Sequence, residues 1–260
     1  MSEPKAQRPT HPLVVRASMA LSPTMVRVIF AGDAVRDFPD SAVPALGFTD
    51  TYVKLRFGEA VRAYTLRSVN REAAELVIDF VVHGDSGLAG PWAAAAAVGD
   101  EIEFVGPGGE WAPRADADSH LFVGDEAALP AIGSSLDALL GERPHARALV
   151  FAEVEAPGYE YPLAKGPGVD VRWTYRRDAP YGERLVAAVL SEPWPGGDVE
   201  AFVHGNADMV RPLRRYLLKE RGVPREHLSI SGYWRAGLTD EGWRAEKRDF
   251  NAAMEAESGA

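Results

Sequence analysis

The sequence changes character near residues 113–119, and this change constrains the fold more than any other feature. Before it, short stretches of strand character are separated by Gly, Pro, Asp and Asn, and one helix is predicted at Ala93–Val98. Spacing this close leaves little room for crossover helices, so it favours antiparallel strands closed into a small barrel. The predicted strands are His11–Ala20, Thr24–Ala31, Thr51–Phe57, Arg62–Val69, Glu75–Val82 and Glu101–Val105.

After the change, strands alternate with helices, which predicts a mostly parallel sheet covered on both faces. The expected domains are a barrel over residues 1–115 and an α/β domain resembling nucleotide-binding domains over 116–260. A C-terminal helix is predicted over Asp240–Glu255, with Thr239 as N-cap and an apolar stripe of Trp243, Phe250 and Met254. The strands are expected at His120–Val123, Arg147–Val154, Val169–Tyr175, Glu200–Val203 and Leu228–Gly232, and the helices at Leu129–Gly141, Glu183–Leu190 and Ala207–Arg221.

Composition excludes several classes of function. The chain has no cysteine, which rules out disulfides, thiolate catalysis and cysteine-held iron–sulfur clusters, so any electron transfer must use a bound organic cofactor. The net charge is -10 and no run of Lys or Arg stands out, so nucleic acid is not an expected partner. No stretch is long and apolar enough for a membrane span, the histidines show no metal-ligand spacing, and a cytoplasmic protein without a bound metal is expected.

The first candidate site is the start of a predicted strand, at Arg62, Tyr64 and Thr65. A flat aromatic cofactor needs a ring to stack on, a cation for its phosphates and a short hydrogen-bond donor near its reactive edge. These three side chains could meet those needs. The alternative is an exposed strand with one packed tyrosine.

The second candidate begins in the next strand, where Asp79, Val81 and His83 share one face. Gly84 and Gly87 then open a glycine-bearing loop that runs to Trp92, and its backbone amides at a helix N-terminus could bind a pyrophosphate. The alternative is a strand end followed by an ordinary turn. A further glycine-rich turn, Gly106–Trp111, could approach a ligand or simply join the domains.

The third candidate is the strand-to-helix turn Gly124–Pro130. A dinucleotide fold would offer glycine amides to phosphate here, but Asp125 and Glu126 would repel a pyrophosphate. Contact between Asp125 and ribose hydroxyls is the more reasonable cofactor interaction. The alternative is that the two carboxylates only cap the helix.

Taken in order, these motifs and the C-terminal segment GYWRAGLTDEGWRAEKRDF resemble the siderophore-interacting protein family over nearly the whole chain. The resemblance implies FAD bound on the barrel, in the manner of the ferredoxin-reductase superfamily. It assigns Arg62, Tyr64 and Thr65 to the flavin-binding R-x-Y-T/S motif. It assigns Asp79, His83 and Gly84 to the following strand motif, and Gly87, Ala89 and Trp92 to the phosphate-binding loop, where Gly90 and Pro91 stand in place of the serine and arginine of many members.

The implied function is FAD-dependent reduction of ferric siderophores, which releases iron inside the cell. The flavin converts a two-electron donor into one-electron steps, so no catalytic side chain is expected. NADH or NADPH is the expected donor, with ferredoxin as an alternative. Two rival functions stay open: a general NAD(P)H:flavin or quinone reductase on the same scaffold, and a non-catalytic siderophore-binding protein.

Overall fold

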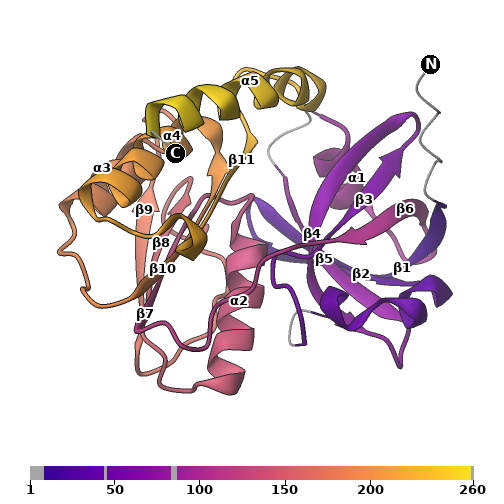
Figure 1. Cartoon of the computed structure of the whole chain (residues 1–260). Helices are drawn as coiled ribbons and strands as arrows, with labels where there is room; N and C mark the ends of the chain where they lie inside the picture. The colour runs from indigo at the N-terminus through magenta and orange to yellow at the C-terminus, as the bar shows by residue number, and fades with distance from the viewer. Residues whose placement is uncertain (1–8, 44–45, 83–86, 259–260) are drawn as a thin grey trace, which may run out of the picture. The chain divides into compact units, whose positions relative to one another are not determined.

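The computed structural model describes residues 9–43, 46–82 and 87–258, and the chain divides into two compact units, 1–112 and 113–260 (Figure 1). In the described part of the first unit, six antiparallel strands form a closed barrel in the order β1-β2-β5-β4-β3-β6. The barrel confirms the fold predicted for this half of the chain. Its strands are β1 (His11–Ser22), β2 (Met25–Ala31), β3 (Tyr52–Phe57), β4 (Ala60–Asn70), β5 (Glu75–Val81) and β6 (Glu101–Gly108), with short 3-10 turns at Asp33–Asp37 and Asp40–Ala42.

Alternate residues of each strand fill the barrel, as the two-residue period of a strand requires. Phe30, Phe80 and Phe104 are fully buried there, together with aliphatic residues from every strand. The helix α1 (Ala89–Ala95) packs against β2 and β5, and the ring of Trp92 lies parallel to that of Phe30 with 6.1 Å between centroids.

The prediction for this helix, Ala93–Val98, was wrong at both ends. The helix starts earlier because Pro91 lies in its first turn, where a missing N–H costs nothing. It ends earlier because the Ala97 amide donates to the Asp100 side chain (2.9 Å), a local bond that replaces the helical one.

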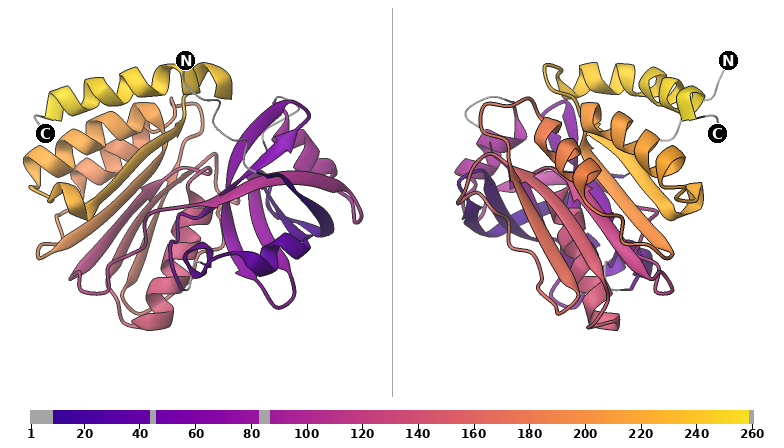
Figure 2. Two further views of the ribbon diagram at one scale, coloured as in Figure 1. Left: turned by 45° about the vertical axis from the view of Figure 1, so that its right-hand side comes forward. Right: turned by 90° about the vertical axis from the view of Figure 1, so that its left-hand side faces the viewer.

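The second unit contains a parallel sheet, which in the described residues has five strands in the order β11-β10-β7-β8-β9. One face of the sheet carries α2 and the other carries α3, α4 and α5 (Figure 2). This is the predicted α/β architecture. Its strands are β7 (Ser119–Gly124), β8 (Ala148–Val154), β9 (Val169–Tyr175), β10 (Val199–Asn206) and β11 (Leu228–Trp234), and its helices are α2 (Leu129–Glu142), α3 (Glu183–Ser191), α4 (Ala207–Arg215) and α5 (Asp240–Ser258).

Helices cover both faces of the central strands, so every residue of β7 and β10 is buried. The segment predicted as one helix over Ala207–Arg221 is instead α4 followed by a π-helical turn, Tyr216–Glu220, and a 3-10 turn follows at Arg225–His227. Pro212 inside α4 has no N–H to donate, and the Arg221 amide bonds to the Tyr216 carbonyl five residues back.

The C-terminal helix α5 packs through the predicted stripe. Trp243 and Met254 are buried, and Phe250 lies against Trp243 with 5.3 Å between ring centroids. Thr239 is the N-cap as predicted, because its hydroxyl accepts from the Gly242 amide at 3.1 Å. Among the helices that the structure describes, none combines the length and apolar character needed to cross a bilayer.

Candidate functional site

The predicted barrel residues lie on two neighbouring strands, beyond the point where those strands pair. Pairing between β4 and β5 runs from Leu66↔Ile78 to Asn70↔Glu75. Arg62, Tyr64 and Thr65 precede this ladder in β4, while Asp79 and Val81 follow it in β5. The first two sequence motifs therefore lie on neighbouring strands, in the parts of β4 and β5 beyond their shared ladder.

Tyr64 connects the two motifs by packing on β5. Its ring lies 4.5 Å from the ring of Phe80, measured between centroids, and Phe80 in turn lies 6.0 Å from Trp92. Tyr64 is half-buried against the barrel core, so packing on Phe80 of β5 restricts the orientation of its ring. A ring held in this way is suited to stacking on a flat cofactor.

Arg62 and Thr65, the other two members of the motif, lie where β4 pairs with β3. Arg62 is opposite Leu55 and Thr65 is opposite Tyr52, and both side chains are half-buried. One guanidinium nitrogen of Arg62 donates to the Val61 carbonyl at 3.1 Å. Both residues therefore lie on the part of β4 that pairs with β3 and precedes the ladder with β5.

Asp79 has a structural role that the sequence did not indicate. It is opposite Arg27 on β2, and the guanidinium donates to both carboxylate oxygens, from Nε at 2.7 Å and from Nη2 at 2.8 Å. The Asp79 side chain is fully buried. A bidentate pair of this kind holds β2 and β5 together, and a direct contact of Asp79 with a cofactor stays a prediction.

The predicted phosphate loop lies partly outside the described residues, which do not include His83 and Gly84. Gly87 adopts a left-handed conformation (φ +83°), which favours glycine, and Ala89 is buried at the start of α1. A Cβ added at Gly90 would lie 3.3 Å from the Val81 carbonyl oxygen, so the first turn of α1 approaches the end of β5 closely. The loop and the strand motif are therefore neighbours.

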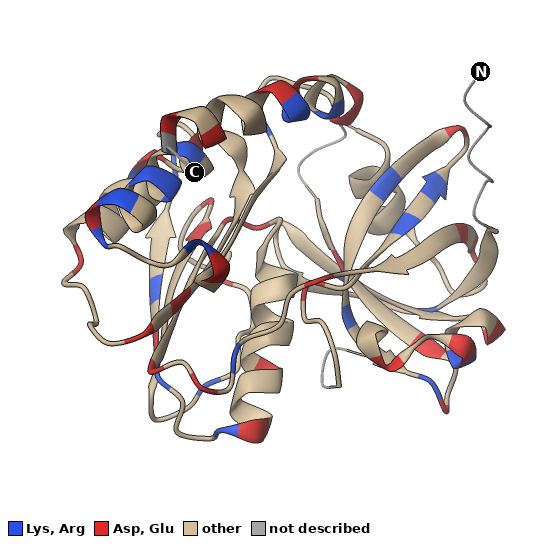
Figure 3. Ribbon diagram, in the orientation of Figure 1, with Lys and Arg blue, Asp and Glu red and all other residues tan. Residues whose placement is uncertain are grey.

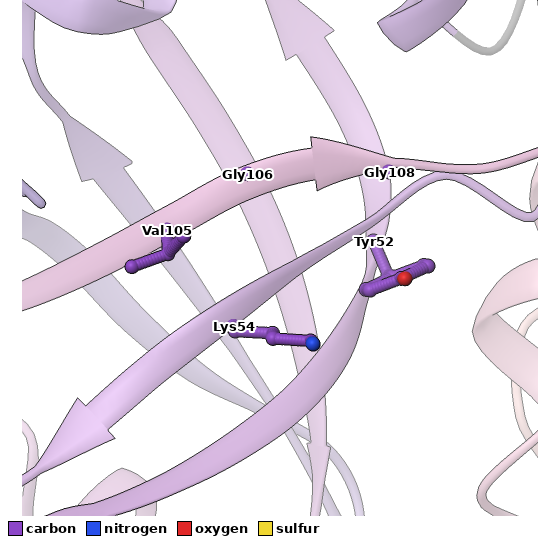
Figure 4. A pocket seen from close by; sticks show the side chains of 5 residues that line it. All are labelled: Tyr52, Lys54, Val105, Gly106 and Gly108. Atoms are coloured by element: carbon purple, nitrogen blue, oxygen red, sulfur yellow. The ribbon is translucent and has the colours of Figure 1, made fainter. Parts of the chain in front are cut away.

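A pocket of about 160 Å³ lies between β3 and β6 (Figure 4). Tyr52 and Lys54 line it from β3, and Val105, Gly106 and Gly108 line it from β6. The Tyr52 ring lies on Gly108, where an added Cβ would be 3.0 Å from Cζ of the ring. Because Tyr52 pairs with Thr65 of β4, the pocket is one strand away from the predicted flavin site.

Asp50 was missed by the sequence reasoning. Its carboxylate accepts from the amides of Glu110 and Trp111, both at 3.0 Å, and the Thr49 amide donates to the Trp111 carbonyl at 2.8 Å. Burial raises the pKa of Asp50. These bonds fix the end of the glycine-rich turn that follows the pocket.

In the second unit, Asp125 joins the carboxyl ends of three strands. Its Oδ1 accepts from the Ala127 amide at 3.0 Å, and its Oδ2 accepts from the Asn206 amide at 2.7 Å and from Nε1 of Trp234 at 2.9 Å. Burial, together with the nearby charge of Glu126, raises the pKa of Asp125 to about 7. Three donors already occupy this buried carboxylate, and a contact of Asp125 with ribose hydroxyls stays a prediction.

A buried ion-pair group lies next to Asp125. The guanidinium of Arg176, which follows β9, donates to both oxygens of Glu126 at 3.1 and 3.2 Å and to Glu153 at 3.4 Å. It also lies 4.0 Å from the centroid of the Tyr181 ring. Burial raises the pKa of Glu153, whose Oε1 accepts from the Gly182 amide at 3.0 Å.

The ribbon of both units carries Lys and Arg interspersed with Asp and Glu (Figure 3). The carboxyl end of the parallel sheet, where α/β folds bind ligands, has a more acidic composition, because two carboxylates there, Glu126 and Glu153, share Arg176. Neither this group nor the partners Asn206 and Trp234 could be found from the sequence, because they come together only when distant strands pair.

Comparison with protein families identifies both units. Residues 117–237 match the model of the siderophore-interacting protein, and residues 59–111 match that of the siderophore-interacting FAD-binding domain. The second match covers β4, β5 and α1, the elements that carry the predicted flavin residues.

Three relatives share 30–39% identity with this chain. An uncharacterized protein of Mycobacterium tuberculosis is 39% identical over 98% of this chain and 99% of its own length. The ferric vibriobactin reductase of Vibrio cholerae is 31% identical over 72% of this chain and 68% of its own. An NADPH-dependent ferric-chelate reductase of Escherichia coli is 30% identical over 62% of this chain and 61% of its own.

Solved structures give the same result. A siderophore utilization protein from T. fusca superposes with a TM-score of 0.77 at 30% identity, covering 89% of this chain and 95% of that chain. The siderophore-interacting protein of Aeromonas hydrophila superposes with a TM-score of 0.79 at 27% identity, covering 94% of this chain and 99% of that chain. The chain therefore belongs to the siderophore-interacting protein family.

Proposed function

We propose that this protein is an FAD-dependent reductase of ferric siderophores that releases iron as Fe(II) in the cytoplasm. The observation that carries the proposal is that Tyr64, on the strand that also holds Arg62 and Thr65, packs on Phe80 of the second motif, within the segment that matches an FAD-binding domain. The Vibrio relative is named for reduction of a ferric siderophore, which supports the substrate class.

The residues of the two motifs fit a flavin. Tyr64 offers a ring held by Phe80, Arg62 offers a cation, and Thr65 offers a hydroxyl from the same strand. The close approach of Gly90 to Val81 leaves little space for a side chain there and brings the backbone of the loop to the strand. Gly87, Ala89 and Trp92, with His83 and Gly84, complete the proposed set.

When bound, the flavin supplies the redox chemistry, taking two electrons from a donor and passing them singly to Fe(III). One-electron reduction weakens the hold of oxygen-rich chelators on iron. The side chains of this chain bind and orient: Tyr64 sets the plane of the cofactor, and Arg62 neutralises phosphate charge. Lys54 in the neighbouring pocket provides a positive charge for an anionic chelate.

The proposed donor is NADH or NADPH, and the name of the Escherichia coli relative supports the phosphorylated form. Ferredoxin is the alternative donor. A ferric siderophore is the proposed partner on the acceptor side.

The test is the visible spectrum of the purified protein, recorded anaerobically before and after each addition. A flavin spectrum that bleaches with a reductant and returns when a ferric siderophore is added, with Fe(II) trapped by a colorimetric chelator, supports the proposal. Reoxidation by quinones or free flavin but not by ferric chelates would indicate a general reductase instead. A protein that lacks flavin and does not take up added FAD would indicate a siderophore-binding protein.

Tyr64→Ala tests the site itself. We expect a flavin dissociation constant raised by at least about tenfold, since base–aromatic and ring-stacking contacts contribute on the order of 1–3 kcal/mol. Val69→Ala is the matched control, because Val69 also lies on β4, half-buried against the same core, but within the paired ladder. Equal flavin affinities in the two variants would remove Tyr64 from the site.

A further inference from the structure

The N-terminus of α2 is the place where a parallel α/β sheet usually binds the pyrophosphate of a dinucleotide, through free backbone amides. In this chain those amides are already used by one residue. The Ala127 amide donates to the Asp125 carboxylate at 3.0 Å, and the amides of Ala128 and Leu129 donate to the Asp125 carbonyl at 2.9 and 3.2 Å. The next residue, Pro130, has no N–H.

The space in front of these amides is filled as well. Asp125 is 1% exposed, and its carboxylate also accepts from the Asn206 amide of the neighbouring strand. A Cβ added at Gly205 would lie 2.6 Å from Oδ1 of Asp125, so the carboxylate packs directly on the backbone of β10. A phosphate group could reach the Ala127 and Asn206 amides only by displacing the side chain, and the amides of Ala128 and Leu129 would stay bonded to the Asp125 carbonyl.

The charge around the turn also opposes an anion. Glu126 is the next residue, Glu153 approaches from β8, and the only cation in this buried group of described residues, Arg176, is engaged by both glutamates. Tyr181, which follows β9, completes the titratable groups that face Asp125. A pyrophosphate would meet two glutamates and an aspartate carboxylate that already accepts three hydrogen bonds.

We propose that Asp125 weakens the binding of nicotinamide nucleotides as electron donors. Its carboxylate occupies the position at the start of α2 that the pyrophosphate of the nucleotide would take. NADH and NADPH then bind without a pyrophosphate contact to this turn, and therefore weakly. The inference rests on the proposed reductase function, of which it describes the donor side.

The experiment measures NAD+ affinity by calorimetry on the flavin-loaded protein, because NAD+ binds without reducing the flavin. Asp125→Ser shortens the side chain and opens the space in front of the Ala127 and Asn206 amides. Glu126→Gln is the matched control, because it removes a neighbouring charge but frees none of the amides. A hydrogen bond to a charged group contributes about 1.5–3 kcal/mol, so we expect at least about tenfold tighter NAD+ binding by Asp125→Ser, and a smaller gain in Glu126→Gln.

No gain in Asp125→Ser, or an equal gain in Glu126→Gln, would overturn the proposal. If Asp125→Ser does not fold, hydrogen exchange of the wild-type protein tests whether NAD+ contacts the start of α2. Saturating NAD+ should leave exchange in the 125–134 segment unchanged, and protection there would refute the inference. Reduction of a ferric siderophore by dithionite-reduced protein uses no nucleotide, so it tests the reductase function separately.

Discussion

Replacing Asp125 with Asn should remove a pH dependence from the stability of this protein. Burial and the charge of Glu126 raise the pKa of Asp125 from 3.8 to about 7 in the native state. Because the native pKa lies above the unfolded one, the native state holds the proton more tightly between these values. Protonation of Asp125 therefore adds to the free energy of unfolding. This contribution is complete below about pH 4 and is lost as the pH rises to 7.

The magnitude follows from the size of the shift. Each pKa unit corresponds to about 1.4 kcal/mol, so the shift of roughly three units amounts to about 4 kcal/mol over the whole titration. Between pH 5 and pH 8 the unfolded carboxyl is already ionised while the native one titrates. The wild type should therefore lose about 3 kcal/mol of stability over this range relative to Asp125→Asn.

The assay is urea unfolding of both proteins at pH 5, 6, 7 and 8, followed by far-UV circular dichroism. All other titrating groups are common to the two proteins, so the difference in unfolding free energy isolates Asp125. The hydrogen bonds that Asn cannot accept add an offset that does not depend on pH. A difference that stays constant from pH 5 to pH 8 would refute the assignment of a raised pKa to Asp125.

Two further perturbations test the packing of the units. Arg27→Met should destabilise the protein by about 3–5 kcal/mol, because it removes the ion-pair partner of the buried Asp79 carboxylate. Adding Asp79→Leu should restore much of that loss. Urea unfolding measures both effects, and a cost of Arg27→Met below about 1 kcal/mol would contradict the reasoning. Trp243→Ala should cost about 3–5 kcal/mol because the indole is buried against Gly232 and Phe250; an unchanged urea midpoint would show that α5 does not stabilise the second unit.

The architecture could be predicted from the sequence because it depends on local spacing. Short strands separated by turn residues predicted the barrel, and alternating strands and helices predicted the parallel sheet. The errors were also local: Pro91 lies inside the first turn of α1, and Pro212 lies inside α4. Pro91 affects the start of α1 and Pro212 precedes the π-helical turn after α4, and the pattern of apolar residues did not reveal either effect.

The candidate site was less predictable, because its chemistry depends on partners distant in the chain. Asp79 is held by Arg27, and Asp125 is held by the Asn206 amide and by Trp234. Sequence reasoning identified both acids as candidate cofactor contacts. It could not show that each is already bonded within the fold, since the register of neighbouring strands determines those partners.

The strand order of the second unit has a consequence for self-association. β9 is at one end of the parallel sheet, and an exposed edge strand is a template on which another chain can add a strand. Asp170 and Arg172 on β9 are exposed and form an ion pair at 2.7 Å, and Glu192 approaches the same guanidinium at 3.3 Å. A second strand pairing here would have to bury or displace these charges, so they protect the protein against edge-to-edge aggregation at high concentration.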